Sequence, residues 1–173
     1  MLKYINHYPP HLTDPVRQLL ERGELGRVLQ QRYPQRHSVR SNKALYDYTM
    51  ALKNRFLRKS APLNKVEFSD KAPAYNALGL HKRISRAHGG KLIARKEIHI
   101  DQRFRDVPEE FLRMIVVHEL AHLKEMQHNK AFYNLCCHME PDYHQLEFDL
   151  RVWLTWHAAS ASDQPAPEQS APE

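Results

Sequence analysis

The sequence predicts an α+β fold in which a small sheet packs beside a histidine-containing helix. Three observations indicate this class: helical spacing of apolar residues in the N-terminal third, alternation of apolar and polar residues over 92–100, and a largely apolar helical segment after Pro108. A chain of 173 residues is long enough for one domain with its own core. We therefore expect a single domain over 1–157, with a helical part at 1–60.

Helix start and stop signals define the N-terminal part. Asp14 precedes Pro15 as an N-cap would, and Gly23 is expected to end this first helix. A second short helix is predicted over 24–32. Ser41 can cap a longer helix, on which four apolar residues recur at spacings of three and four: Leu45, Tyr48, Leu52 and Phe56.

The middle of the chain predicts strands. Even positions over 92–100 are mostly apolar and odd positions mostly polar, which is typical of a half-buried strand. Gly89 and Gly90 separate it from a strand at 80–87, and a glycine pair supplies the positive φ angles of a tight hairpin. A shorter strand at Lys65–Phe68 is expected to join them. The predicted sheet is small and antiparallel or mixed.

Three more helices and a tail are predicted after the sheet. The first follows Asp106 or Pro108 and runs through residue 123, the second is capped by Asn129, and the third starts at Pro141. Residues 158–173 contain only Ala, Ser, Pro, Asp, Glu and Gln. Because such a segment cannot bury enough apolar surface to offset the entropy of ordering, we expect a disordered tail there.

The helix after Pro108 contains the pattern HExxH, formed by His118, Glu119 and His122. On an α-helix the two imidazoles point about 40° apart and lie about 6 Å apart along the axis, so both can reach one ion. Their neighbours are nearly all apolar, and burying three polar side chains without partners would be costly. We predict Zn²⁺ as the cofactor, with another divalent metal as the alternative, and Glu119 as the general base that activates a zinc-bound water.

The third ligand is predicted to be His128, six residues after His122. This histidine spacing is that of the metzincin pattern HExxHxxGxxH, although Glu125 stands at the glycine position. A continuous helix would carry His128 out of reach, so the chain must turn sharply between 124 and 128. Without glycine, residue 125, 126, 127 or 129 must accept the turn conformation. Glu125 and Glu147 remain alternative third ligands.

Residues elsewhere give weaker indications. Tyr143 or His144 would be a donor to an oxyanion formed at the site. Cys136 and Cys137 are adjacent, which excludes a disulfide framework and fits reducing surroundings; we interpret them as packing residues.

Composition adds expectations about partners and location. The net charge of +6 and the pI near 9.4 favour anionic partners, including nucleic acid, without identifying a site. The N-terminal residues lack the apolar stretch of a signal peptide, and no apolar run approaches the roughly 20 residues of a membrane helix. We expect a cytoplasmic protein without a membrane partner.

Two segments, MIVVHELAHLKEMQHNKAFY and CCHMEPDYHQLEFDLRVWL, resemble the YgjP-like metallopeptidase-domain family, whose pattern is HELAH, five residues and a further histidine. The likeness extends upstream through LGLHKRISRAHGGKLIARKEIHI, although many members carry a WGSCS-like stretch where this chain has KRISRAHGG. The resemblance implies a zincin-like fold with the small sheet beside the HExxH helix. It also implies metal ligands at His118, His122 and His128 and a general base at Glu119.

This family carries both metallopeptidase and UTP pyrophosphatase labels, so the resemblance implies a zinc metallohydrolase with one of two substrates. A metallopeptidase, our first expectation, would bind an extended peptide against the strand 92–100. The alternative, a nucleoside triphosphate (UTP) pyrophosphatase, would hold phosphates with cations of the basic hairpin 82–96. A lesser alternative is a DNA-associated, Spartan-like protease. A structural zinc module is disfavoured, since it has no use for Glu119.

Overall fold

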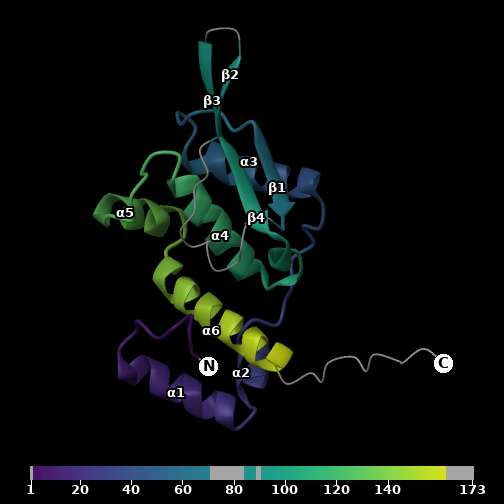
Figure 1. The fold of residues 1–173 in the computed structure, drawn as a ribbon, viewed down its shortest axis with the longest axis vertical. Coiled ribbons are helices and arrows are strands. Elements are labelled where there is room, and N and C mark those ends of the chain that lie inside the picture. The colour runs from purple at the N-terminus through teal and green to yellow at the C-terminus, as the bar shows by residue number, and fades with distance from the viewer. Residues whose placement is uncertain (1, 71–83, 89–90, 163–173) are drawn as a thin grey trace, which may run out of the picture. The chain divides into compact units, whose positions relative to one another are not determined.

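A computed structural model describes residues 2–70, 84–88 and 91–162 (Figure 1). Helices and strands are both present, which confirms the α+β class. The chain divides into two compact units, one formed by Met1–Pro34 with Phe148–Glu173 and the other by Gln35–Glu147. No helix in the described ranges combines the length and the apolar character that crossing a bilayer requires. The single domain over 1–157 stays a prediction.

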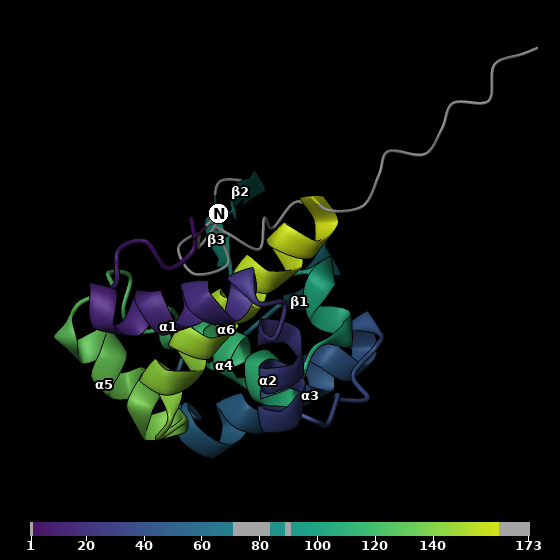
Figure 2. The same cartoon turned by 90° about the horizontal axis from the view of Figure 1, so that it is seen from below.

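The first unit contains α1 (Pro10–Glu21), α2 (Leu25–Arg32) and most of α6 (Tyr143–Ser162) (Figure 2). The predicted start of α1 at Asp14 is wrong, because Pro10 occupies the first helical position, where the missing N–H has no partner to lose. Gly23 ends α1 as predicted, with a φ of 70°.

Polar and close apolar contacts fix this unit. The Tyr33 hydroxyl donates to the buried carboxylate of Asp149. A Cβ placed on Gly26 would lie 2.6 Å from the Trp156 side chain, so glycine permits this close packing. Helix α6 continues to Ser162, so the first five residues of the expected tail, 158–162, are helical because they extend the apolar helix before them. The remainder, 163–173, lies outside the described residues.

The second unit contains α3 (Asn42–Phe56), α4 (Glu109–Ala121), α5 (Lys130–Met139) and all the strands. Two predicted caps are confirmed: the Ser41 hydroxyl accepts the N–H of Ala44 at 3.1 Å, and the Asn129 side chain accepts that of Phe132 at 2.9 Å. Local capping signals therefore define the starts of α3 and α5, the helices that precede and follow α4 in the sequence.

Beside α4 the sheet is parallel, with β1 (Lys65–Ser69) paired to β4 (Glu97–Asp101) (Figure 1). The prediction of an antiparallel or mixed sheet at this place is wrong. The long connection between the two strands allows the crossover that parallel pairing requires. Apolar and polar residues alternate as predicted, with four core residues on one face: Val66, Phe68, Ile98 and Ile100.

The predicted hairpin is a separate, two-stranded antiparallel ladder. It joins β2 (Ile84–His88) to β3 (Lys91–Arg95), with His88 opposite Lys91. The sequence predicts one strand over 92–100, but the structure divides it at Lys96. There the chain changes partner, because the Lys96 N–H donates to Asn64 Oδ1 at 3.2 Å and its carbonyl accepts the Asn64 N–H at 2.9 Å. Residues 80–83 and the Gly89-Gly90 turn lie outside the described residues.

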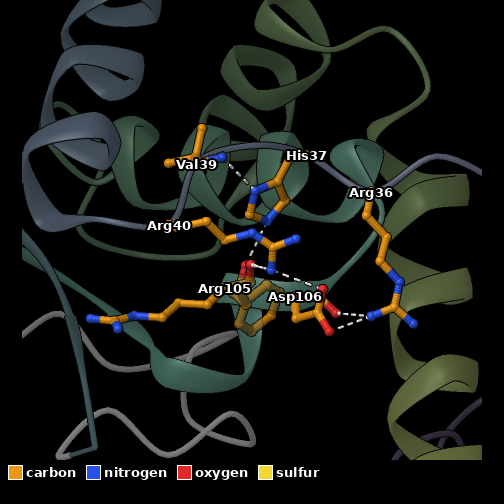
Figure 3. Close-up of polar contacts among 7 residues, drawn as sticks. Arg36, His37, Val39, Arg40, Arg105 and Asp106 are labelled. Atoms are coloured by element: carbon orange, nitrogen blue, oxygen red, sulfur yellow. Dashed lines mark hydrogen bonds and ion pairs between the residues drawn. The ribbon is translucent and has the colours of Figure 1, made fainter.

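A buried histidine ties the segment before α3 to the 3₁₀ helix η1 (Gln102–Asp106) (Figure 3). His37 Nε2 donates to the Phe104 carbonyl at 2.7 Å, and Nδ1 accepts the Val39 N–H at 3.1 Å. Asp106 reinforces the junction by accepting from Arg36 and Arg40 (Figure 3). Because one ring nitrogen donates and the other accepts, both bonds require a neutral imidazole.

We expect this histidine to make stability depend on pH. Burial lowers the pKa of His37 from 6.5, against smaller opposing effects of the Phe104 carbonyl, Asp106 and Glu109, while Arg40 lowers it further. As the pH falls below 6.5, the unfolded chain binds a proton that the folded chain does not, so the free energy of unfolding decreases. Above that pH the contribution is fully present.

The measurement is the urea midpoint at several pH values on either side of 6.5. His37→Gln should show a shallower decrease below 6.5 than the wild type, whereas substitution of the exposed His11 by glutamine should not change the slope. Equal slopes for the wild type and His37→Gln would contradict the assignment.

Candidate metal centre

Helix α4 positions two of the three predicted ligands. Glu109 and Glu110 lie in its first turn, where acidic side chains interact favourably with the helix dipole. All residues from 114 to 121 are buried. His118 and His122 are 2% and 3% exposed, so their imidazoles lie within the core, where polar groups need partners.

The chain turns directly after α4, as the prediction of His128 as third ligand requires. The N–H groups of Lys124 and Glu125 both donate to the Ala121 carbonyl at 3.0 Å. We expected one of the non-glycine residues 125, 126, 127 or 129 to adopt a left-handed conformation in this turn. That expectation is wrong, because within the described ranges Gly23 alone has a positive φ. Overlapping short hydrogen bonds at the helix end tighten the last turn, so no glycine is needed.

The structure brings the three predicted histidines together. His118, His122 and His128 each offer a ring nitrogen within 4.8 Å of the others. His128 Nε2 lies 3.3 Å from His118 Nε2 and 3.1 Å from His122 Nε2. Tetrahedral zinc with nitrogen ligands at about 2.0–2.1 Å places those nitrogens about 3.3 Å apart, so the observed spacing fits a shared ion. His118 and His122 are buried and His128 is exposed, which leaves the triad open on one side.

The far ring nitrogens of the two buried histidines have partners of their own. His122 Nδ1 lies 2.9 Å from the Glu125 carbonyl oxygen. Because a carbonyl only accepts, Nδ1 must donate, which leaves the lone pair of His122 Nε2 facing the other imidazoles. His118 Nδ1 lies 2.7 Å from the Tyr143 hydroxyl. The chain thus fixes the orientation of both rings from behind.

Phe132 forms an apolar wall against the triad, a role that the sequence analysis does not predict. Its fully buried ring lies 5.0 Å from the ring of His118, 4.6 Å from His122 and 4.8 Å from His128, measured between centroids. The ring limits the access of water to the triad and holds the three imidazoles in one arrangement. Its position three residues after the α5 cap Asn129 is the signal that could have indicated it.

The alternative ligands do not join the cluster. Among the described residues the triad is the only group of three or more side chains placed to share a metal ion, and neither Glu125 nor Glu147 belongs to it. Glu125 instead supports His122 through its backbone carbonyl. Tyr143 does not fit the role of an oxyanion donor, because its hydroxyl contacts Nδ1 of His118, on the ring edge away from Nε2. His144 stays a prediction.

Glu119 lies on α4 beside His118 and is 3% exposed. A buried carboxylate next to potential metal ligands is expensive unless it interacts with them or with a reacting group. This placement is compatible with the predicted general base.

Only one cation of the basic hairpin 82–96 has a described side chain. Lys96 Nζ donates to the Leu123 carbonyl at 2.9 Å, in the turn that follows α4. This bond ties the residue just before β4 to the end of the histidine-bearing helix, and a positive charge there is favourable beside the helix C-terminus. Of the other predicted phosphate-binding residues, Lys82 and Arg83 lie outside the described residues, and only the backbone is described for Arg86, Lys91 and Arg95.

Comparison with known proteins places this site in a family. A family model described as "YgjP-like, metallopeptidase domain" matches residues 74–152, which include all three histidines. A protein from Escherichia coli (strain K12) named "UTP pyrophosphatase" is 58% identical over 155 residues, covering 89% of this chain and 93% of that protein. The chain belongs to the YgjP-like family. No solved structure matches it.

Membership of the YgjP-like family identifies the chain as a hydrolase, since the family description and the name of the relative both denote hydrolytic enzymes. The family description and the histidine triad together indicate a metal ion. The resemblance found in the sequence is confirmed.

Proposed function

We propose that this YgjP-like protein is a metal-dependent nucleoside triphosphate pyrophosphatase that acts on UTP. The observation that carries the proposal is the 58% identity to a protein named UTP pyrophosphatase, over nearly the whole of both chains. The histidine triad supports it by supplying a place for the metal. This reverses the order that the sequence favours, in which peptide hydrolysis comes first.

His118, His122 and His128 would hold the ion, and we propose Zn²⁺. Three neutral imidazoles suit zinc better than magnesium or calcium, which prefer oxygen ligands. When bound, zinc supplies Lewis-acid polarisation of a phosphoryl oxygen and makes water a better nucleophile at neutral pH. The partners of Nδ1 on the two buried rings direct Nε2 to the shared position.

Glu119 would be the general base. Its carboxylate would take a proton from water as the water oxygen forms a bond to the α-phosphorus and the bond to the leaving diphosphate breaks. The products are UMP and diphosphate. Burial in α4 limits the exchange of this carboxylate with bulk solvent.

Peptide hydrolysis is the second candidate, favoured by the description of the family as a metallopeptidase domain. Strand β4 contacts α4 and has β1 on one side, so an extended peptide bound near this helix would suit a zincin-like arrangement. The same triad and Glu119 would serve. The Spartan-like hypothesis stays a lesser alternative.

A side-by-side assay tests the proposal. Zinc-loaded protein is incubated with UTP and, separately, with an unstructured protein such as casein, and diphosphate, UMP and new peptide termini are measured. We expect equal amounts of UMP and diphosphate and no casein cleavage. Cleavage of casein without release of diphosphate from UTP would overturn the proposal in favour of the peptidase.

A further inference from the structure

Aromatic rings continue from the metal centre beyond the triad. Tyr133, the fourth residue of α5, has its ring centroid 6.4 Å from that of His128, the exposed member of the triad. The ring of His144, in the first turn of α6, lies 5.4 Å from that of Tyr133. Aromatic rings whose centroids are about 4.5–7 Å apart contact one another. Contacting rings of the second unit therefore connect the open side of the triad to His144.

Tyr133 and His144, here called the aromatic shelf, lie at the surface over buried rings. Tyr133 is half-buried and His144 is exposed, whereas their chain neighbours Phe132 and Tyr143 are fully buried. The Tyr133 ring lies 5.3 Å from that of Phe132 and 6.3 Å from that of Tyr143. The rings of Tyr143 and His144 lie 5.7 Å apart. Because the buried rings support the shelf, it can contact a ligand without first being ordered.

The place of the shelf beside the triad suits the base of a nucleotide. Only the ribose separates the base from the α-phosphate, so a nucleotide whose phosphates reach the triad must have its base close by. Aromatic side chains are the usual platforms for nucleobases, because every base has a flat π face that stacks on them. Phosphates are held by cations and hydrogen-bond donors instead, so the shelf adds little to their binding.

We propose that the aromatic shelf of Tyr133 and His144 binds the nucleobase of the substrate by stacking. Both are then substrate-binding residues that take no part in the chemical step. In this arrangement His144 contacts the base instead of donating to an oxyanion. The inference rests on the proposed function, because it takes the substrate to be a nucleotide.

Three variants test the shelf. Tyr133→Ala and His144→Ala each remove one ring, and Tyr133→Phe keeps the ring at 133 without its hydroxyl. Because His144 is exposed, its variant keeps the test decisive if loss of the half-buried Tyr133 ring prevents folding. The matched controls are Tyr46→Ala, which removes another half-buried tyrosine ring of the same unit, and His138→Ala, which removes an exposed histidine of α5.

The measurement separates the base from the phosphates. Calorimetry gives the affinity for a UTP analogue in which nitrogen replaces the oxygen between the α- and β-phosphates, so that it cannot be cleaved there. It also gives the affinity for inorganic triphosphate, which has no base. Both titrations use metal-free and zinc-loaded protein, and the release of diphosphate from UTP is measured on the same preparations.

We expect Tyr133→Ala to weaken binding of the UTP analogue by about 5- to 150-fold, the usual effect of removing an aromatic ring on which a base stacks. Its affinity for inorganic triphosphate should not change. His144→Ala should show the same selective loss, and Tyr133→Phe should recover most of the affinity that Tyr133→Ala loses. Since stacking tolerates any base, the matching cytidine analogue should be affected in the same proportion. Both controls should bind as the wild type does.

The inference is overturned if either alanine variant of the shelf binds the UTP analogue as tightly as the wild type, or loses affinity for inorganic triphosphate to the same extent. A wild type that does not bind the analogue also overturns it. A wild type that binds the analogue but releases no diphosphate from UTP would overturn the proposed function instead. The variants would then still show whether the base contacts the shelf, so the two failures are distinguishable.

Discussion

Glu119→Gln is expected to lower the turnover of UTP by about 10²- to 10⁴-fold, the usual contribution of a positioned general base. Glutamine has nearly the same shape as glutamate but cannot accept the proton of the attacking water. The bound metal should be unaffected, because Glu119 is not one of the three side chains that share the ligand position. Steady-state release of diphosphate and elemental analysis of the same preparation measure the two effects.

The matched control is Glu109→Gln, which makes the same chemical change on the same helix at its exposed N-terminal turn. It should keep wild-type turnover. Full activity in Glu119→Gln would show that the base is another residue, and loss of metal in this variant would show that the carboxylate holds the site together rather than accepting a proton.

His122→Ala is expected to abolish both metal binding and hydrolysis. The substitution removes one of the two buried imidazoles of the triad and leaves His118 and His128 as the remaining imidazoles. We expect the zinc affinity to fall by more than the roughly 10- to 100-fold that loss of an outer hydrogen-bond partner causes. Activity should decrease to the level of the wild type treated with a chelator.

His138→Ala controls for the loss of a histidine, because this residue is exposed on α5 and its ring contacts Phe56 instead of the triad. Metal content and turnover should match the wild type. A stoichiometric metal ion in His122→Ala would show that the assigned ligand set is wrong and that a carboxylate, such as that of Glu125 or Glu147, completes the site.

Local signals in the sequence were sufficient for the helices and the triad. The spacing of His118 and His122 sets their common face, and the Asn129 cap marks the start of α5. His128 lies between His122 and the Asn129 cap. Because a continuous helix would carry it too far from His118 and His122 to share an ion, the turn could be inferred from the distance alone. The backbone of that turn could not, because hydrogen bonds to the Ala121 carbonyl remove the need for a left-handed residue.

Features that depend on distant residues were missed. The pairing of β1 with β4 joins strands separated by the whole hairpin, and no periodicity in either strand specifies whether they run parallel. The contact between His118 and Tyr143 spans 25 residues, and that between His37 and Phe104 spans 67. Such contacts depend on how helices and strands pack against one another. Residue patterns in a single sequence indicate local structure and do not show which distant residues will meet.

The closeness of the three imidazoles along the chain, within residues 118–128, affects how much a metal ion can stabilise the protein. A ligand raises stability only by the difference between its affinities for the native and denatured states. A denatured chain can close so short a loop at small entropic cost and chelate zinc through the same side chains. The gain in melting temperature on zinc addition should therefore be smaller than the gain calculated from the native-state affinity on the assumption that the denatured chain binds no zinc.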